Sequence, residues 1–367
     1  MPSVAVRILH PPAAPGAGPL TRWLAAARAA GAEAHRSGFH AAGATEVEIV
    51  AGLGEGLPFG ARLRALVRDL EASAGLVVLG SGAMPLATTA DRRKFVEAAA
   101  SGERRALANN RYSADALAIG RATSLLSVPD LPADNALPRW LDEVGGYHVD
   151  DLGRRWRLGV DVDSPLDVAL VARWRNLNTV PDTPADLDLR TLTSRIEAVA
   201  AVGADRRAEL LVAGRTSAAA LRWLEVGTAS RVRAFVEERG LRAATGLARA
   251  DGGEPRRPPR SLLGDRLDRD GPAALGVALA ELSDGALVDT RVLLAHRLGA
   301  GEATWPSAED RFASDLLIAD RIADPWLRAL TASAAAASIP ILLGGHTLVG
   351  PGLRLLFGTS RRVTELA

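Results

Sequence analysis

The sequence predicts an α/β protein: a mostly parallel sheet with helices on both faces, followed by a second α/β domain. Three observations lead to this prediction. Short apolar runs rich in Val, Ile and Leu alternate with segments whose leucines recur at helical spacing. Continuous apolar runs of this kind are typical of parallel strands, and their alternation with helices is typical of βαβ units. The length of 367 residues exceeds that of one typical domain.

The first half alternates strands with helices. An Ala-rich helical stretch follows the first strand, leucine spacing indicates the second helix, and Thr or Asp opens the third. The predicted strands are 4–9, 46–52, 75–80, 104–108, 115–119, 146–149 and 157–162. The predicted helices begin at Leu20 and Pro165 and cover 58–73 and 88–101.

A polar, proline-bearing stretch at 178–190 is the predicted domain boundary, so we expect domains at 1–177 and 190–367. The second half again alternates strands with helices, and its Gly-, Pro- and charge-rich stretch at 248–261 is expected to be a loop. The predicted strands are 208–214, 231–238, 286–296 and 339–345, and the predicted helices are 190–203, 216–229, 272–283 and 307–336.

Composition excludes several classes of protein. Lys and Arg number 44 against 43 Asp and Glu, so a generally basic nucleic-acid-binding surface is not expected. No apolar run reaches the roughly 18 residues of a membrane span, and the N-terminus lacks the pattern of a signal peptide, so we expect a cytoplasmic protein without membrane partners. Cysteine is absent and Lys94 is the only lysine, which argues against thiolate and Schiff-base chemistry.

In an open parallel sheet, ligands bind at the carboxyl ends of the strands. This rule selects the candidate segments of the first domain, and we expect them to meet in one crevice. They are the loop 10–19, residues 52–56, 80–84 and 109–112, and the aspartates of the run RLGVDVDSPLDVAL at 157–170.

Within that run, Asp161 and Asp163 are two residues apart, so in an extended chain both carboxylates point to the same side. Paired carboxylates at a strand end are suitable ligands for Mg²⁺. Ser164, Pro165 and Asp167 have the spacing of a capped helix start. The alternative is that the two aspartates merely end a strand and solvate the turn, and the spacing alone leaves both interpretations open.

Two segments carry a resemblance to a known family. VDVDSPLDVAL (160–170) and GLVVLGSGAMPLATTADRRKF (75–95) resemble the corresponding segments of nucleotidyltransferases with the glycosyltransferase-A-like fold, in particular molybdenum-cofactor guanylyltransferases and 2-phospholactate guanylyltransferases. The resemblance covers just under half of the chain. It implies a nucleotide-diphospho-sugar transferase-like fold, Mg²⁺ held by Asp161 and Asp163, and a nucleoside triphosphate or nucleotide sugar with a small phosphorylated acceptor as partners.

The resemblance also implies nucleotide-binding residues. In this family a glycine-rich loop with Arg and Lys holds the triphosphate, and the corresponding loop here, HPPAAPGAGPLTRW (10–23), offers Gly16, Gly18 and Arg22 but no lysine. Asn109 and Arg111 could contact the nucleotide's base or ribose and its phosphates, or could belong to an Asn-rich hairpin turn. The loop could likewise be an ordinary surface connection.

One position departs from the family pattern. A metal-binding Asp of the family falls on Ala83, which cannot bind a metal ion. The leading hypothesis is a nucleotidyltransferase-like protein with Mg²⁺-dependent transfer, and the alternative is a non-catalytic nucleotide- or metabolite-binding protein. A third hypothesis places catalysis in the second domain around His346, which follows a predicted strand and two glycines. The sequence leaves the acceptor, the nucleotide base and a homo-oligomer open.

Overall fold

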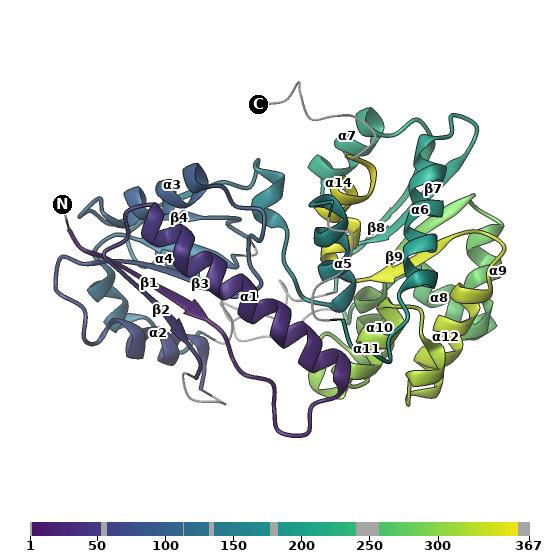
Figure 1. The fold of residues 1–367 in the computed structure, drawn as a ribbon, viewed down its shortest axis with the longest axis horizontal. Coiled ribbons are helices and arrows are strands. Elements are labelled where there is room, and N and C mark those ends of the chain that lie inside the picture. The colour runs from purple at the N-terminus through teal and green to yellow at the C-terminus, as the bar shows by residue number, and fades with distance from the viewer. Residues whose placement is uncertain are drawn as a thin grey trace. The chain divides into compact units, whose positions relative to one another are not determined.

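The structure, a computed structural model, describes residues 2–52, 57–112, 114–131, 136–176, 183–239 and 257–358 (Figure 1). Contacts between residues divide the chain into two compact units. The first unit contains residues 2–15 and 25–162, and the second contains 16–24, 163–239 and 257–358. The described part of the segment 178–190 lies in the second unit, and residues 177–182 and most of the predicted loop 248–261 are outside the described residues.

The first unit is built on a six-stranded mixed sheet with the order β2-β1-β3-β5-β4-β6. Strand β5 runs antiparallel to β3 and β4, and the other pairs are parallel. Only seven residues join β4 to β5, too few for the crossover that a parallel pair needs. The strands are β1 (Val4–Leu9), β2 (Glu46–Val50), β3 (Gly75–Gly80), β4 (Arg105–Ala108), β5 (Ala116–Ile119) and β6 (His148–Asp151).

Helices cover both faces of this sheet, as predicted (Figure 1). Side chains alternate along β3: Leu76 and Val78 pack into one apolar core, and Val77 and Leu79 pack into the other. The first core is completed by α2 (Phe59–Val67), the 3₁₀ helix Ala122–Ser127 and α4 (Leu137–Glu143). The second is completed by α1 (Pro19–Ala41) and α3 (Thr89–Ala99).

The predicted strand 157–162 is wrong. The chain forms a 3₁₀ helix at Trp156–Gly159 and then a single β-bridge at Asp161. Gly159 interrupts the apolar pattern, and the amide of Leu158 donates to the carbonyl of Arg155 at 2.8 Å, which closes a tight turn instead of a strand ladder.

The second unit contains a four-stranded sheet with the order β10-β9-β7-β8, in which every pair is parallel. The chain runs from β7 outwards to β8 and then returns to β9 on the other side of β7. The carboxyl ends of β7 and β9 therefore form the topological switch point of this sheet. The strands are β7 (Glu209–Gly214), β8 (Arg231–Val236), β9 (Gly285–Asp289) and β10 (Ile341–Gly344).

Helices of the second unit pack around this sheet (Figure 1). They are α5 (Pro165–Trp174), α6 (Arg190–Ala204), α7 (Ala218–Gly227), α8 (Leu262–Asp270), α9 (Leu275–Ala280), α10 (Thr290–Leu298), α11 (Ala308–Asp315), α12 (Pro325–Ala336), α13 (His346–Val349) and α14 (Gly352–Phe357).

Most predicted elements of the second unit differ from the structure by a few residues at their ends, and two differ in kind. The predicted strand 286–296 ends at Asp289, whose carboxylate accepts from the amide of Arg291 and caps helix α10. The predicted helix 307–336 is two helices, because Asp324 caps a new helix that begins at Pro325.

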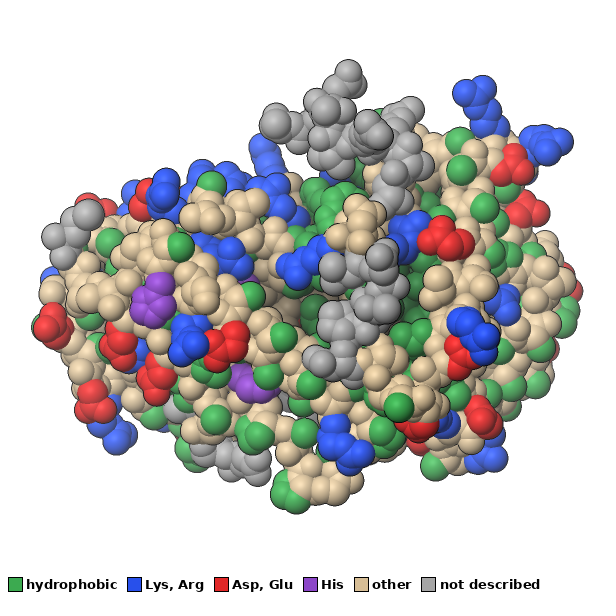
Figure 2. Space-filling model, viewed as in Figure 1, with side chains coloured by type: hydrophobic (Ala, Val, Ile, Leu, Met, Phe, Trp, Pro, Cys, Tyr) green, Lys and Arg blue, Asp and Glu red, His purple; other side chains and the backbone are tan. Residues whose placement is uncertain are grey.

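Acidic and basic side chains are interspersed over the face of the protein in Figure 2, in keeping with the nearly balanced composition. Within the described ranges, none of the helices has the length and sustained apolar character needed to cross a lipid bilayer.

A buried carboxylate holds the start of α3. Thr88 and Asp91 form the predicted cap, with the side chain of each accepting from the amide of the other. The Asp91 side chain is fully buried and also accepts from the guanidinium groups of Arg155 and Arg157. Burial raises the pKa of Asp91, but the hydrogen bonds from Arg157, Thr88 and Arg155 outweigh it and hold the pKa well below its usual range.

We expect Asp91→Asn to lower the free energy of unfolding at pH 7 by about 2–4 kcal/mol, because two guanidinium groups lose their common counter-ion. Since the native pKa is lowered, this contribution is present above the unfolded-state pKa near 4 and is lost as the pH falls below it. Urea unfolding at pH 7 and pH 3 measures the effect. Asp150→Asn, which breaks an exposed pair with Arg105, is the control and should cost less than about 1 kcal/mol. Equal losses for both variants would contradict the assignment.

Candidate functional site

The two segments that carry the family resemblance meet in the first unit, where residues 160–162 of the second segment lie beside residues 82–84 of the first. Ala83 and Asp161 form an antiparallel bridge, and the amide of Val162 donates to the carbonyl of Gly82 at 3.0 Å. Asp161 is therefore paired with a residue that offers only a methyl group, at the position where the resembling family has a metal-binding carboxylate.

A guanidinium group also stands near Asp161. A Cβ atom built on Gly82 would lie 2.9 Å from Asp161 Oδ1 and 3.1 Å from Arg28 Nε, and Arg28 Nε donates to the Val162 carbonyl at 2.7 Å. One carboxylate, a methyl group and a nearby guanidinium are a poorer donor set than Mg²⁺ prefers. The assignment of Mg²⁺ to Asp161 and Asp163 stays a prediction.

The carboxyl ends of β1 and β3 bring a histidine and a serine together. His10 Nδ1 lies 3.1 Å from Ser81 Oγ, and burial, followed by the charge of Arg28, lowers the pKa of His10. The imidazole is therefore neutral at pH 7. A Cβ atom on Gly80 would meet no other atom within 4 Å, so the backbone at the end of β3 borders open space.

Asn109 supports the connection between β4 and β5. Its Oδ1 accepts from the amides of Asp115 and Ala116 at 3.0 and 3.1 Å, and its Nδ2 donates to the carbonyl of Leu158 at 2.9 Å. Asn109 is buried, so these contacts favour the hairpin-turn interpretation that the sequence left open.

Arg111 forms an ion pair with Asp142, and its amide donates to Asp151 at 3.3 Å. Nothing in the structure tests the nucleotide-binding roles predicted for Asn109 and Arg111, and both remain predictions.

The glycine-rich loop before α1 holds one of the chain's own carboxylates. Glu309 accepts from the amides of Leu20 and Thr21 at 2.9 and 3.1 Å and from Thr21 Oγ1 at 2.9 Å. A Cβ atom on Gly18 would lie only 2.2 Å from the Glu309 carboxyl carbon, so a larger residue there would displace this carboxylate. The amide groups at the start of α1 thus already bind a protein carboxylate, and the nucleotide-binding role of Gly16, Gly18 and Arg22 stays a prediction.

The predicted nucleotide-binding residues fall in different units. Gly16, Gly18 and Arg22 belong to the second unit, whereas Asn109 and Arg111 belong to the first. Arg22 donates to the carbonyl of Ala17 in its own loop.

Asp163 lies in the second unit, directly before Ser164, the N-cap residue of α5. The predicted cap of α5 is confirmed. Asp167 Oδ2 accepts from the amides of Asp163 and Ser164 at 3.0 and 2.8 Å and from Ser164 Oγ at 2.9 Å. Asp167 is buried, and its Oδ1 has no hydrogen-bond partner among the described residues. Burial, followed by the charges of Asp163 and Asp315, raises the pKa of Asp167 to about 7. A carboxyl group that titrates near neutrality is a common feature of functional sites.

The switch point of the second sheet is organised by Asp289, the last residue of β9. This buried carboxylate accepts from Arg215 Nε at 2.6 Å, from Arg215 Nη2 at 3.1 Å and from the amide of Arg291 at 3.1 Å. Burial raises the pKa of Asp289, but the charge and hydrogen bonds of Arg215 outweigh it and lower the pKa. Gly214 has a φ of +134°, and a Cβ atom there would lie 2.3 Å from Asp289 Cβ, so only glycine allows this approach.

His346 follows β10 at the same edge of the sheet. Its Nδ1 lies 3.0 Å from the carbonyl oxygen of Arg215, which can only accept, so Nδ1 carries the proton of this hydrogen bond. Burial, followed by the charge of Arg215, lowers the pKa of His346. The neutral ring therefore keeps Nε2 as an acceptor, able to serve as a base or to accept from a ligand.

A second buried ion pair supports the first. Arg291, in the first turn of α10, donates to Asp315 Oδ2 at 2.6 Å and to the hydroxyl of Thr290 at 2.9 Å. Thr290 in turn donates to the carbonyl of Gly344 at the end of β10 at 3.2 Å. These contacts tie the carboxyl ends of β9 and β10 together.

Beyond β8, two more arginines surround Trp305. The guanidinium carbons of Arg239 and Arg311 lie 5.0 and 5.7 Å from the centre of the Trp305 ring, and both groups donate to Glu302 at 2.8 Å. Burial, followed by the charge of Arg215, lowers the pKa of Arg239. The guanidinium groups of Arg215 and Arg239 are thus within electrostatic reach of each other at this edge.

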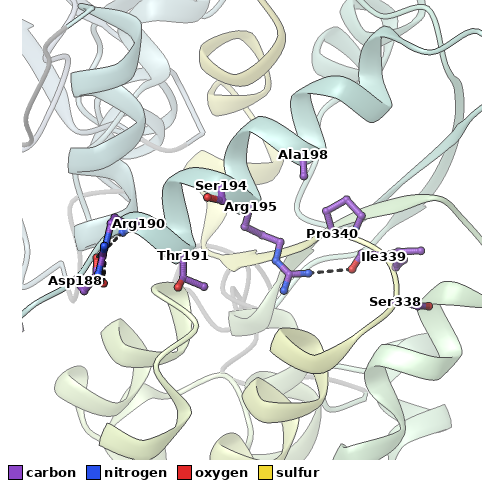
Figure 3. Close-up of a pocket in the computed structure, with 9 residues that line it drawn as sticks. All are labelled: Asp188, Arg190, Thr191, Ser194, Arg195, Ala198, Ser338, Ile339 and Pro340. Carbon is purple, nitrogen blue, oxygen red and sulfur yellow. Dashed lines mark hydrogen bonds and ion pairs between the residues drawn. The ribbon is translucent and has the colours of Figure 1, made fainter.

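Two other features of the second unit do not form a comparable site. Figure 3 shows an open hollow of about 680 Å³ in which Arg195 donates to the carbonyl of Ile339 at 3.1 Å and Arg190 is paired with Asp188 at 2.8 Å. Both arginines therefore already have partners. The lining residues are Asp188, Arg190, Thr191, Ser194, Arg195, Ala198, Ser338, Ile339 and Pro340.

The second feature is a group of Asp265, Asp268 and His296 with ligand atoms within 4.8 Å of one another. The amide of Ser261 donates to His296 Nδ1 at 3.0 Å, so the neutral ring carries its proton on Nε2, which lies 3.0 Å from Asp268. A metal ion would need that Nε2 lone pair, and the observed tautomer makes a structural hydrogen bond instead.

The sequence singled out His346 but did not show that Arg215 and Asp289 join it. The Asp at the end of the apolar run of β9 indicates that the strand ends there. The leucines of α10 follow so closely that strand and helix resembled one apolar run. Glu309 gave no signal at all, because its partners lie 288 and 289 residues away in the sequence.

Asp167→Asn should remove part of the pH dependence of stability. Because the native pKa is raised, ionised Asp167 destabilises the native state as the pH rises from the unfolded-state value near 4 to about 7. Between pH 4 and pH 7.5, the free energy of unfolding of the variant should therefore rise relative to that of the native sequence, by up to about 4 kcal/mol. Urea unfolding across this range measures the difference, and a constant difference would contradict the raised pKa.

Comparisons of the chain with protein-family models, with curated proteins and with solved structures found no match.

Proposed function

We propose that this chain is a nucleotidyltransferase-like protein that binds a nucleoside triphosphate or nucleotide sugar at the carboxyl edge of the six-stranded sheet. The observation that carries the proposal is the bridge between Ala83 and Asp161. It joins residues 78 positions apart in the sequence and so brings together two segments that resemble the same family.

The chemistry of this edge supports a phosphate-bearing ligand. Arg28 supplies a permanent positive charge, and Ser81 supplies a hydroxyl group beside the neutral ring of His10. The open space at Gly80 allows a ligand to approach the backbone at the end of β3. A crevice at the carboxyl ends of adjacent parallel strands is also the usual ligand position in α/β sheets.

Two versions of this function differ in chemistry. In the first, the protein transfers a nucleotidyl group to a small phosphorylated acceptor with the help of Mg²⁺. In the second, it binds the nucleotide or a related metabolite without transfer. A specific observation favours binding without transfer: the residue across the bridge from Asp161 is Ala83, which has no side-chain ligand atom, and Arg28 lies nearby.

Arg28→Gln should weaken nucleotide binding by roughly tenfold or more, because a charge-assisted contact to phosphate is lost. Arg36→Gln is the matched control, since Arg36 lies on the same helix in an exposed pair with Glu33 and should leave binding unchanged. Calorimetric titration with a panel of nucleoside triphosphates and nucleotide sugars measures both. If no nucleotide binds, or if the two variants behave alike, the proposal fails.

Asp161→Asn separates the two versions. Transfer through Asp161-held Mg²⁺ predicts that the variant loses Mg²⁺-dependent pyrophosphate release. Binding without transfer predicts no pyrophosphate release from either protein, and tighter triphosphate binding by the variant, because a negative charge near the phosphates is removed. Pyrophosphate release and nucleotide affinity, each measured with and without Mg²⁺, give the answer.

A further inference from the structure

The carboxyl edge of the four-stranded sheet gathers four arginine side chains in ion pairs. Asp289 pairs with Arg215, Asp315 pairs with Arg291, and Glu302 alone serves both Arg239 and Arg311. Asp167 also lies within electrostatic reach of Arg291. The charge of Arg215 lowers the pKa of Arg239, so an anion that contacts both of these guanidinium groups would be stabilised.

Two hydrogen-bond donors at this edge lack partners. Thr216, directly after Arg215, is 7 % exposed, and its Oγ1 is buried without a hydrogen-bond partner in the described part of the chain. Arg239 Nε is likewise buried without a hydrogen-bond partner among the described residues. Because Gly214 pairs with Val236 in the register of β7 and β8, the residues that follow both strands lie at one edge. A buried donor without a partner is costly, and a ligand that accepts hydrogen bonds would remove the cost.

The start of helix α7 and the ring of His346 also lie at this edge of the sheet. Helix α7 begins at Ala218 with Ser217 as its cap, and amide groups at a helix start attract anions. His346, held by the carbonyl of Arg215, offers the acceptor Nε2. Since Nε2 accepts, it cannot bind a phosphate oxygen, and it suits a hydroxyl group of the ligand instead.

We propose that this edge binds a small phosphate monoester that carries hydroxyl groups, with the phosphoryl group at Arg215, Thr216 and Arg239 and a hydroxyl group at His346. Guanidinium groups form charge-assisted hydrogen bonds with phosphate, and the phosphate oxygens would accept from the unpartnered Thr216 Oγ1 and Arg239 Nε. This site belongs to the second unit and does not depend on the nucleotide site proposed for the first.

The test is calorimetric titration of the full chain with glycerol 3-phosphate and with inorganic phosphate. Both should bind, and glycerol 3-phosphate should bind more tightly because only it brings a carbon-bound hydroxyl group to His346. Thr216→Val should weaken both by about tenfold. Its Tm should be unchanged or higher, because the hydroxyl group that is removed has no partner in the protein. Thr191→Val, the same substitution at an exposed position, is the matched control and should bind as the native sequence does.

His346→Asn tests the hydroxyl position. Asparagine can keep the hydrogen bond to the Arg215 carbonyl but lacks Nε2, so the affinity for glycerol 3-phosphate should fall to that for inorganic phosphate, which should not change. The proposal is overturned if neither compound binds, if Thr216→Val binds as tightly as the native sequence, or if His346→Asn weakens both compounds alike.

Discussion

The buried carboxylate of Asp289 is the interaction on which the second unit depends. It ends β9, caps α10 through the amide of Arg291, and holds the guanidinium group of Arg215, whose carbonyl oxygen then orients His346. A buried charge must be paired, so this one group determines the positions of the residues that follow three strands. Gly214 is part of the same constraint, because any Cβ atom there would collide with Asp289.

Carboxylates held by several hydrogen-bond donors also occur at the starts of other helices. Asp91 holds two arginines at the start of α3, and Glu309 fills the start of α1. Asp167 differs, because one of its oxygens has no partner and its pKa rises to about 7. Asp91 and Glu309 stabilise helix starts through their hydrogen bonds. Asp167 is instead a carboxyl group that titrates near neutral pH beside the Arg291–Asp315 pair, a feature that is common at functional sites.

Much of the fold could be predicted from the sequence because local signals were strong. The strands 4–9 and 75–80 have the predicted bounds, since each is a continuous apolar run, and Ser164–Pro165 marks the start of α5. The stretch 286–296 was predicted as one strand because its apolar residues continue from strand into helix, where short apolar runs do not distinguish the two.

The candidate site was less predictable than the fold, because its contacts join residues far apart in the sequence. Arg215 and Asp289 are 74 positions apart, and His346 lies 131 positions from the carbonyl that orients it. The sequence could nominate His346, but only the parallel register of β7, β9 and β10 brings it to one edge with Arg215 and Asp289.

Nitrogen-15 NMR of the histidine rings as a function of pH shows whether Arg215 holds His346 as described, with the His346 signals identified by their loss in His346→Asn. We expect the pKa of His346 to lie below the usual value, since burial and Arg215 both disfavour the charged form, and the neutral ring to carry its proton on Nδ1. A pKa at or above the usual value, or a neutral ring with its proton on Nε2, would show that Arg215 does not orient His346.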